Sequence, residues 1–348
     1  MKRLIIYNLE TDLDSHVLAA AHDWVESFAN HTAEVIVYST HVGTYSLAEN
    51  VVVNEIGGGS PRKKVIAILR LLRSAIKEIP NRKDISVFHH MSTRSLLITG
   101  LIYRGMGVKQ GLWYSHSKKS ISLKFSHFFA NEIFTSTSNA IPISSSKINY
   151  VGHGIKTERF TNGPSTSQLS RSGVVAVGRV VPIKRVEFLI DAVFNSGIQE
   201  LRITCLGPFE EEDAYPQRLM SLAKLKKVDL VLKGAIPYAC LPALLINFDF
   251  VFTGTPSSVD KAVIEGALSG CFVISSEKQA LKLTGMDKVF EALGFKDIPT
   301  LAVQLLTLSG LPTREKEILR SKLSARAREL NDLDRTTLEI LRKIESSI

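Results

Sequence analysis

The stretch "VAVGRVVPIKR", residues Val175–Arg185, joins a short buried-strand pattern to an abrupt turn. Its apolar run ends at Gly178, and two cations, Arg179 and Lys184, follow within six residues. Glycine allows backbone conformations that other residues resist, and Pro182 stiffens the turn. A helical pattern comes next, so the stretch predicts a strand–turn–helix unit with its cations at the carboxyl end of the strand.

The position of these cations suggests a ligand. In open parallel sheets, ligands bind beyond the carboxyl ends of the strands. Arg179 offers a planar fork of donors that suits phosphate oxygens, and Lys184 adds a compact positive charge. Together they are suited to hold a diphosphate without a metal ion. The alternative is a plain strand-to-helix turn with two solvated cations, and spacing alone does not separate the two interpretations.

Strand-like and helical runs alternate on both sides of this unit, which is typical of parallel sheets covered by helices. Residues 161–172 are rich in Ser, Thr, Gly and Pro and predict a linker. We therefore expect two Rossmann-like domains, residues 1–160 and 173–330, that face each other across a cleft. The expected strands are Arg3–Leu9, Glu34–Thr40, Val51–Ile56, Ile85–His90, Leu112–His116, Glu132–Ser136, Val174–Val177, Leu201–Leu206, Asp229–Leu232, Asp249–Phe252 and Cys271–Ser275.

Composition narrows the class of protein. The 348 residues are 45% hydrophobic and 22% charged, which is ordinary for a globular protein of two domains. The three cysteines, Cys205, Cys240 and Cys271, lack disulfide or zinc-ligand spacing and fit a reducing compartment. The first apolar run is too short for a signal peptide, and no stretch approaches the roughly 18 apolar residues of a membrane span. We expect a cytoplasmic protein.

The net charge of +9 predicts an anionic partner. A nucleic-acid binder would interleave aromatic and basic residues, and the 7% of aromatic residues show no such clustering. A nicotinamide-dependent dehydrogenase would carry G-x-G-x-x-G after its first strand, and "LIIYNLETD" has no glycine. Both classes are disfavoured.

A second stretch, "FTGTPSSVDKAVIEGALSGCFVIS", reads as strand, turn, helix and strand. We expect Ser257 or Ser258 to cap the helix, whose amino terminus can then receive a phosphate. Lys261 and Glu265 are four residues apart and share a helix face. Glu265 would lie roughly 9–10 Å along the axis from the cap, about the reach from a diphosphate to the ribose of the same nucleotide. The alternative is an ordinary surface Lys–Glu pair.

Three segments in this order, "VGRVVPIKR", "LVLKGAIPYACLPALL" and "DFVFTGTPSSVDKAVIEGALSGCFVIS", resemble the donor domain of family 4 glycosyltransferases, which have the GT-B fold. In the first half, "LWYSHSKKSISLKF" and "INYVGHGIKTERF" resemble the acceptor domain and crossover of that family. The resemblance implies an acceptor domain at 1–160, a donor domain at 173–330, and a last helix at 331–348 that packs back on the first domain. It also implies transfer of a sugar from a UDP-sugar or GDP-sugar, with retention of configuration and with neither a metal nor another cofactor.

The resemblance also assigns roles to residues. Arg179 and Lys184 match the cations that grip the diphosphate and stabilise it as a leaving group, beside Gly178 and Lys261 in the donor site. Glu265 matches the ribose-binding second glutamate of an E-x7-E motif, and Ser257 stands where the first glutamate should be. Two further matches complete the site: the histidine that faces the transferring sugar is His116, and the segment whose backbone reads the base contains Ile236.

The serine at position 257 leaves a second hypothesis open. In the family, the carboxylate at this position contacts the donor sugar, so its loss favours a non-catalytic or weakly active sugar-nucleotide-binding protein as the alternative to an enzyme. Asp260 lies close by in the sequence as a substitute carboxylate. A sugar-nucleotide epimerase of the same two-domain fold is a minor rival.

Basic amphipathic segments point to a surface partner. Residues Ser60–Lys83 predict a helix with an apolar stripe among many cations, and Lys118–Lys124 is a second basic patch. Such a helix can rest on an anionic membrane surface, and a glycan or lipid-linked acceptor would fit. The alternative is a helix whose apolar stripe packs into the core, the stripe being Val65, Ile66, Ile68, Leu69 and Leu72.

Overall fold

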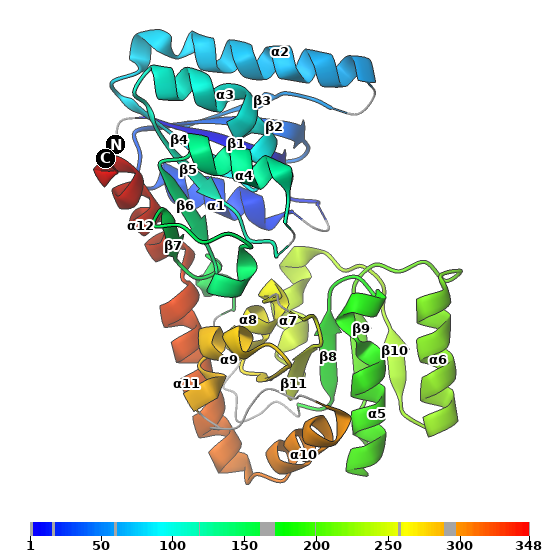
Figure 1. Cartoon of the computed structure of the whole chain (residues 1–348). Helices are drawn as coiled ribbons and strands as arrows, with labels where there is room; N and C mark the ends of the chain where they lie inside the picture. The colour runs from blue at the N-terminus through cyan, green and yellow to red at the C-terminus, as the bar shows by residue number, and fades with distance from the viewer. Residues whose placement is uncertain are drawn as a thin grey trace. The chain divides into compact units, whose positions relative to one another are not determined.

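The computed structural model describes residues 3–15, 18–58, 61–117, 119–160, 171–198, 200–256, 259–288 and 297–347. The chain divides into two compact units (Figure 1). Unit 1 comprises Met1–Lys156 together with Asp332–Ile348, and unit 2 comprises Thr157–Asn331. Residues 161–170 of the predicted linker lie outside the described residues.

Unit 1 contains a seven-stranded parallel sheet in the order β3-β2-β1-β4-β5-β6-β7. Chain order reverses between β1 and β4, which makes their carboxyl ends the switch point of this sheet. Its elements are β1 (Arg3–Thr11), α1 (Ala20–Ala29), β2 (Glu34–Val42), β3 (Val51–Glu55), α2 (Pro61–Lys77), β4 (Ile85–His90), α3 (Thr93–Gly105), β5 (Lys109–Trp113), α4 (Ile121–Phe129), β6 (Glu132–Thr135), β7 (Ile148–Tyr150) and α12 (Leu333–Ser346).

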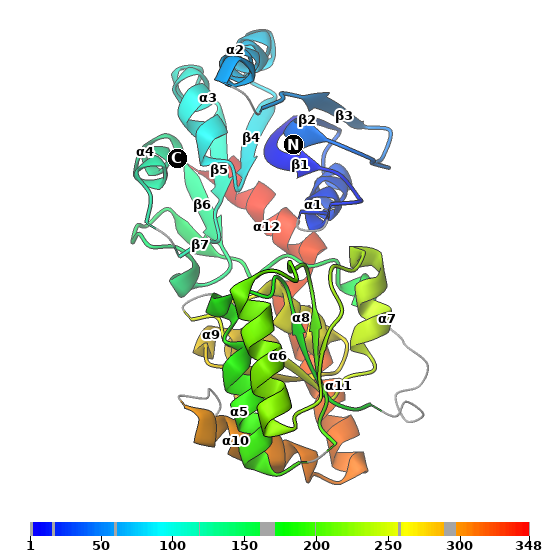
Figure 2. The ribbon, with the colours of Figure 1, turned by 90° about the vertical axis from the view of Figure 1, so that its right-hand side faces the viewer.

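Both faces of this sheet are covered, which explains why the consecutive residues Leu4–Tyr7 of β1 are all buried. Successive side chains of β1 point to opposite faces. Leu4 and Ile6 join a core cluster with α1 and α12, whereas Ile5 and Tyr7 join a cluster with α2 and α3. Figure 2 shows α2, α3 and α4 on one side of the sheet and α1 with α12 on the other.

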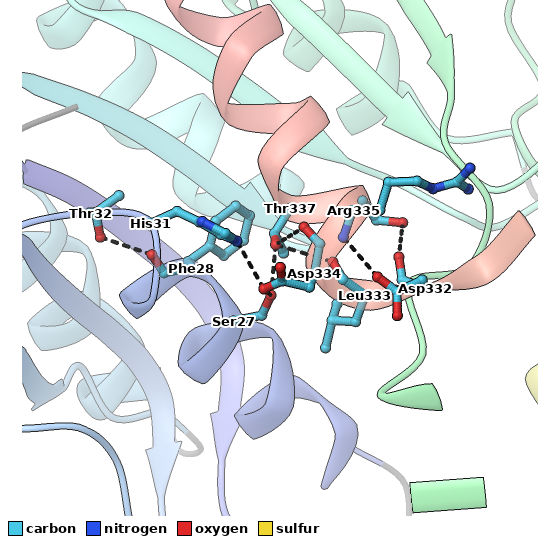
Figure 3. Close-up of polar contacts among 10 residues, drawn as sticks. Ser27, Phe28, His31, Thr32, Asp332, Leu333, Asp334, Arg335 and Thr337 are labelled. Carbon is cyan, nitrogen blue, oxygen red and sulfur yellow. Dashed lines mark hydrogen bonds and ion pairs between the residues drawn. The ribbon is translucent and has the colours of Figure 1, made fainter. Parts of the chain in front are cut away.

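The helix α12 returns from the end of the chain to pack against α1, β5 and β6. Figure 3 shows the polar contacts at its first turns. Asp332 caps the helix by accepting from the Arg335 amide, and the Ser27 and Thr337 hydroxyls lie 2.7 Å apart. His31 Nε2 lies 2.8 Å from Asp334 Oδ1. Further along, a Cβ atom at Gly111 would come within 2.5 Å of Ile344 Cδ1, so this glycine makes room for the helix.

Unit 2 contains a five-stranded parallel sheet in the order β10-β9-β8-β11-β12. Chain order reverses between β8 and β11, so the end of β8 lies at the switch point. Helix α5 packs against α6 and α10, and α8 packs against α9 and α11 (Figure 1). The elements are β8 (Val174–Val177), α5 (Val186–Ser196), β9 (Ile203–Leu206), α6 (Ala214–Lys226), β10 (Leu230–Leu232), α7 (Leu241–Leu245), β11 (Phe250–Thr253), α8 (Lys261–Leu268), β12 (Phe272–Ser275), α9 (Lys278–Thr284), α10 (Ile298–Ser309) and α11 (Thr313–Asn331).

The predicted α/β class, with two Rossmann-like parallel units and a last helix that returns to the first, is confirmed. One predicted strand was misplaced: Leu112–His116 is displaced by three residues, because β5 begins in the polar run Lys109–Gly111. The sequence analysis also missed the short edge strand β7 and helices α3 and α4. No described helix combines the length and hydropathy that crossing a membrane requires.

The apolar stripe of α2, for which the sequence left membrane contact and core packing open, is not the face that packs on the sheet. The residues of α2 that are buried against the sheet are instead Leu71, Ser74 and Ala75, with Ala67 partly buried beside them. Val65 is 58% exposed and Leu69 is 60% exposed. The small side chains of Ser74 and Ala75 beside Leu71 allow close packing, whereas Val65 and Leu69 face outward. Core packing is therefore excluded for Val65, Ile66, Ile68 and Leu69, each of which is more than 40% exposed.

Candidate functional site

The turn after β8 places Lys184 over the end of its own strand. Gly178 has φ +118°, in a region that L side chains rarely adopt. A Cβ atom at this position would lie 3.4 Å from Lys184 Nζ, an ordinary van der Waals contact, so the ammonium group lies directly beside this residue and only the positive φ favours glycine here. The chain then makes a short 3-10 turn, Pro182–Lys184, and passes through Arg185 at φ 52° before α5 begins. Left-handed backbone at a residue other than glycine is unfavourable and marks a constrained turn.

Lys184 is held in place by Asp260, the residue before α8. Lys184 Nζ lies 2.8 Å from Asp260 Oδ2, and both side chains are about four-fifths buried, with 21% and 17% exposed. The same oxygen accepts from the Thr255 hydroxyl at 2.8 Å and from Thr253. Burial alone would raise the pKa of Asp260, but Lys184 and the hydroxyl donors outweigh it, so this pKa is lowered. Asp260 is therefore a fixed anion that orients a lysine.

The start of α8 differs from the sequence prediction. The N-cap is Asp260, so the expectation that Ser257 or Ser258 caps this helix is wrong. Both serines lie outside the described residues. The Asp260 carboxylate makes no capping hydrogen bond, because it is engaged by Lys184 and the threonines. Glu265 consequently lies about 7.5 Å along the axis from the cap, less than the sequence suggested.

Glu265 is buried and forms a cluster with two partly exposed side chains. Its Oε1 lies 2.9 Å from Lys261 Nζ and accepts from the Tyr238 hydroxyl at 2.7 Å. Lys261 Nζ also donates to that hydroxyl at 2.5 Å and lies 4.1 Å from the centre of the Tyr238 ring. The Arg159 guanidinium lies 5.0 Å from the same ring centre. Since Glu265 is only 3% exposed, the interpretation as an ordinary surface pair is excluded.

Tyr238 is a site residue that sequence reasoning missed. It begins a 3-10 turn, Tyr238–Cys240, directly after the segment "LKGAIP". The only signal was an aromatic residue next to a segment expected to line a nucleotide. Ile236, in that segment, is half-buried.

The backbone beyond β8 and β9 is closely packed. Gly178 N donates to Leu206 O at 2.9 Å, and Gly207 N donates to Gly234 O at 2.8 Å. A Cβ atom at Gly207 would lie 2.1 Å from the Gly178 carbonyl oxygen. Gly207 is thus required by this neighbour, which favours the plain structural interpretation of that glycine.

The other predicted residues are distributed as follows. Arg179 lies in the same turn as Lys184, is exposed, and forms no ion pair with any described residue. His116 belongs to unit 1, where it is exposed three residues after β5 ends. Unit 2 therefore brings together Gly178, Lys184, Lys261 and Glu265 around the ends of β8, β11 and the start of α8, while His116 is in the other unit.

Two groups of side chains within the described ranges have metal-binding potential, and both lie in unit 1: Glu10, Asp12 and His41, and His22, Asp23 and Glu26. Within the second group, Glu26 is paired with Lys156 at 2.6 Å, and His22 Nε2 accepts from the Ser46 amide at 3.3 Å. His22 Nδ1 is buried and has no hydrogen-bond partner among the described residues. Neither group includes a predicted site residue.

No protein-family model and no curated protein matches this sequence. Solved structures do match it. A glycosyltransferase from Rickettsia africae ESF-5 matches with a TM-score of 0.75 at 15% identity, over 100% of both chains. Anabaena Alr3699/HepE in complex with UDP-glucose matches with a TM-score of 0.73 at 13% identity, over 99% of both chains.

A third match shows how far this likeness extends. A candidate UDP-N-acetylglucosamine 2-epimerase from Listeria monocytogenes matches with a TM-score of 0.64 at 14% identity, over 99% of this chain and 96% of that chain. Transferases and an epimerase thus share the architecture, and identities of 13–15% identify a fold rather than a reaction. With nearly complete coverage in each case, the comparisons show that this chain has the two-domain GT-B fold.

Proposed function

We propose that the protein is a retaining, metal-independent glycosyltransferase that moves a sugar from a UDP-sugar or GDP-sugar to a glycan or lipid-linked acceptor. The observation that carries this proposal is the position of Lys184 over Gly178, next to the first turn of α8. A fixed ammonium group, the exposed guanidinium of Arg179 and free helix-end amides are the donors that a departing diphosphate requires. Because these cations neutralise the leaving group, a metal ion is not needed for that step.

The nucleoside part of the donor is assigned to the Glu265 cluster. Tyr238 and Lys261 both bind the same carboxylate oxygen of Glu265, Oε1. Its other oxygen, Oε2, is assigned to the ribose hydroxyls. The backbone around Ile236 is assigned to the base, and Gly178 and Lys261 complete the donor site.

Ser257 stands where the family has a glutamate. Another carboxylate is therefore needed to accept hydrogen bonds from the donor sugar. Asp260 suits this role, because its Oδ2 is engaged by Lys184, Thr253 and Thr255, while its Oδ1 has no hydrogen bond to a described residue. An anchored carboxylate with one open oxygen can accept from a sugar hydroxyl. His116 is assigned to contact with the transferring sugar.

We assign contact with an anionic membrane surface to the helices α2 and α4 of unit 1. Residues 61–130 contain 14 Lys and Arg residues but only two acidic residues, so this segment carries more positive charge than the whole chain's net +9. Val65 and Leu69 of α2, and Phe125 and Phe128 of α4, are each about 60% exposed. Exposed apolar side chains among cations are typical of a surface that rests on anionic lipid. The protein would then be a cytoplasmic enzyme that associates peripherally with the membrane.

The direct test is donor binding followed by turnover. A thermal-shift screen against uridine, guanosine and adenosine diphosphate sugars identifies the donor, because a ligand that binds the folded state raises Tm. Release of nucleoside diphosphate from that donor, in the presence of a glycan or lipid-phosphate acceptor, then identifies the enzyme. If no member of the panel binds, the proposal fails. Binding without release would favour the alternative, a non-catalytic sugar-nucleotide-binding protein.

A further inference from the structure

A cavity lies within unit 1, outside every site described above. Its volume is about 500 Å³, within the range of small-molecule pockets. It lies beyond the carboxyl ends of β1, β2 and β4, beneath α2 and beside the first turn of α3. These strands include β1 and β4, so the cavity occupies the switch point of the first sheet, where open α/β sheets bind ligands.

The inner wall of the cavity is apolar. Tyr7, Ile68, Leu71 and Ile98 contribute rings and aliphatic groups. The Tyr7 hydroxyl is already engaged, since it lies 2.7 Å from Ser74 Oγ and 2.9 Å from the Tyr103 hydroxyl. Ala67 is a small residue on the inner face of α2, and its size helps leave the space open. This wall is suited to an alkyl or similar apolar group.

Cations line the same cavity. Lys64 at the start of α2 and Arg94 in the first turn of α3 are both exposed lining residues. Neither forms an ion pair with a described residue, and no lining residue is acidic. The Ser92 side chain makes no capping bond at the start of α3, so the helix-end amides near Arg94 add to the positive potential. An anionic group is favoured beside Lys64 and Arg94.

We propose that this cavity binds a phosphate ester that carries an apolar chain, with the phosphate at Lys64 and Arg94 and the chain against the inner wall. Naming this ligand as the sugar acceptor rests on the proposed function; the binding itself does not. The same chemistry occurs in a lipid phosphate and in a soluble phosphate ester, and the apolar wall distinguishes them, because it stabilises only a ligand with a chain to bury.

Isothermal titration calorimetry of the full chain with decyl phosphate, below its micelle concentration, tests the proposal. Wild-type protein should bind decyl phosphate, and binding of glucose 1-phosphate should be much weaker. Arg94→Ala should weaken decyl phosphate by about tenfold, the usual value of a lost charge-assisted hydrogen bond. Arg73→Ala is the matched control, since Arg73 is exposed on α2 and does not line the cavity. Equal weakening by both variants would overturn the assignment of the anion.

Filling the cavity tests the second part of the proposal, that the apolar wall holds the chain of the ligand. Ala67→Phe should remove decyl phosphate binding, and Ile76→Phe, at an exposed position of α2 that does not line the cavity, should leave it unchanged. No binding by wild type, or equal binding of glucose 1-phosphate and decyl phosphate, would overturn the proposal. Because Arg94 is exposed and its variant should fold, the test holds even if Ala67→Phe does not fold.

The same preparations should be titrated with UDP. If decyl phosphate does not bind but UDP does, the cavity assignment is overturned and the proposed function stands. If UDP does not bind but decyl phosphate does, the proposed function is overturned and the cavity assignment stands.

Discussion

Lys184 and Asp260 join two turns that are 76 residues apart in the sequence, with Lys184 Nζ 2.8 Å from Asp260 Oδ2. One residue follows the central strand of unit 2, and the other precedes α8. The pair therefore fixes a cation at the switch point of the sheet. This relationship connects the sequence motif with the electrostatics proposed for the donor site.

Asp260→Asn should disturb the position of Lys184 more than it disturbs the fold. Removing the anion leaves a largely buried ammonium group with weaker partners, which costs about 1–3 kcal/mol of unfolding free energy. UDP affinity should also fall. Asp191→Asn is the matched control, because Asp191 pairs with Lys226 at 3.2 Å with similar exposure, away from the turn after β8. Urea unfolding and UDP titration of both variants check this; equal UDP affinities in the two variants would contradict it.

Glu265→Gln should reduce affinity for an intact nucleotide while leaving pyrophosphate binding nearly unchanged. The carboxylate is assigned to the ribose, which pyrophosphate lacks. Tyr238→Phe should give a smaller loss of the same kind, because it removes one of the two groups that hold Glu265 Oε1. Calorimetric titration with UDP and pyrophosphate checks both. Parallel losses for the two ligands would rule out the ribose assignment.

Anionic vesicles should retain the protein at low salt and release it at high salt, because surface charge is screened. The double variant Val65→Glu/Leu69→Glu should abolish retention by placing two acids on the exposed face of α2. Leu225→Glu is the control: Leu225 is 80% exposed on α6 of unit 2, outside the basic segment. Sedimentation with phosphatidylglycerol and phosphatidylcholine vesicles measures the effect. Equal retention by vesicles of both lipids would contradict the assignment of unit 1 to an anionic membrane surface.

Stability should fall as pH decreases below about 6.5. Burial lowers the pKa of His89 to about 3 and that of His90 to about 4 in the folded state, against about 6.5 when unfolded. The folded state therefore binds fewer protons than the unfolded chain, so the stability that these rings contribute is complete above pH 6.5 and is lost progressively below it. At pH 5, each ring should cost about 2 kcal/mol of unfolding free energy.

His90→Phe tests this most simply. The His90 ring is stacked on Trp24 with centroids 4.7 Å apart, and phenylalanine can keep that contact. The difference in unfolding free energy between pH 7 and pH 5 should shrink by about 2 kcal/mol in the variant. An unchanged difference would show that another group titrates in this range.

The sequence predicted β8 and its turn well because the information is local. The strand Val174–Val177 has the expected bounds, and Gly178 and Lys184 are six residues apart, so one turn can bring them together. The start of α8 was predicted less well. Two serines and an aspartate all suit an N-cap, and the extended backbone of Asp260 directly before Lys261 shows that Asp260 occupies it.

Contacts between distant segments were beyond local reasoning. Tyr238 contacts Glu265, which is 27 residues away in the sequence, and no pattern in either segment predicts this contact. For a related reason, the sequence left two interpretations of the apolar stripe of α2 open. The sheet packs against Leu71, Ser74 and Ala75 of this helix, and this depends on how closely the helix approaches the strands.

The most direct measurement for the central claim is the Kd of UDP, compared with that of uridine, for wild type, Arg179→Ala, Lys184→Ala and the control Lys226→Ala. The two cations of the turn should account for recognition of the diphosphate. Arg179→Ala and Lys184→Ala should therefore each weaken UDP binding by about tenfold or more and leave uridine binding unchanged. Lys226→Ala should behave as wild type. If UDP binds all four proteins equally, the turn after β8 does not hold a diphosphate and the account is wrong.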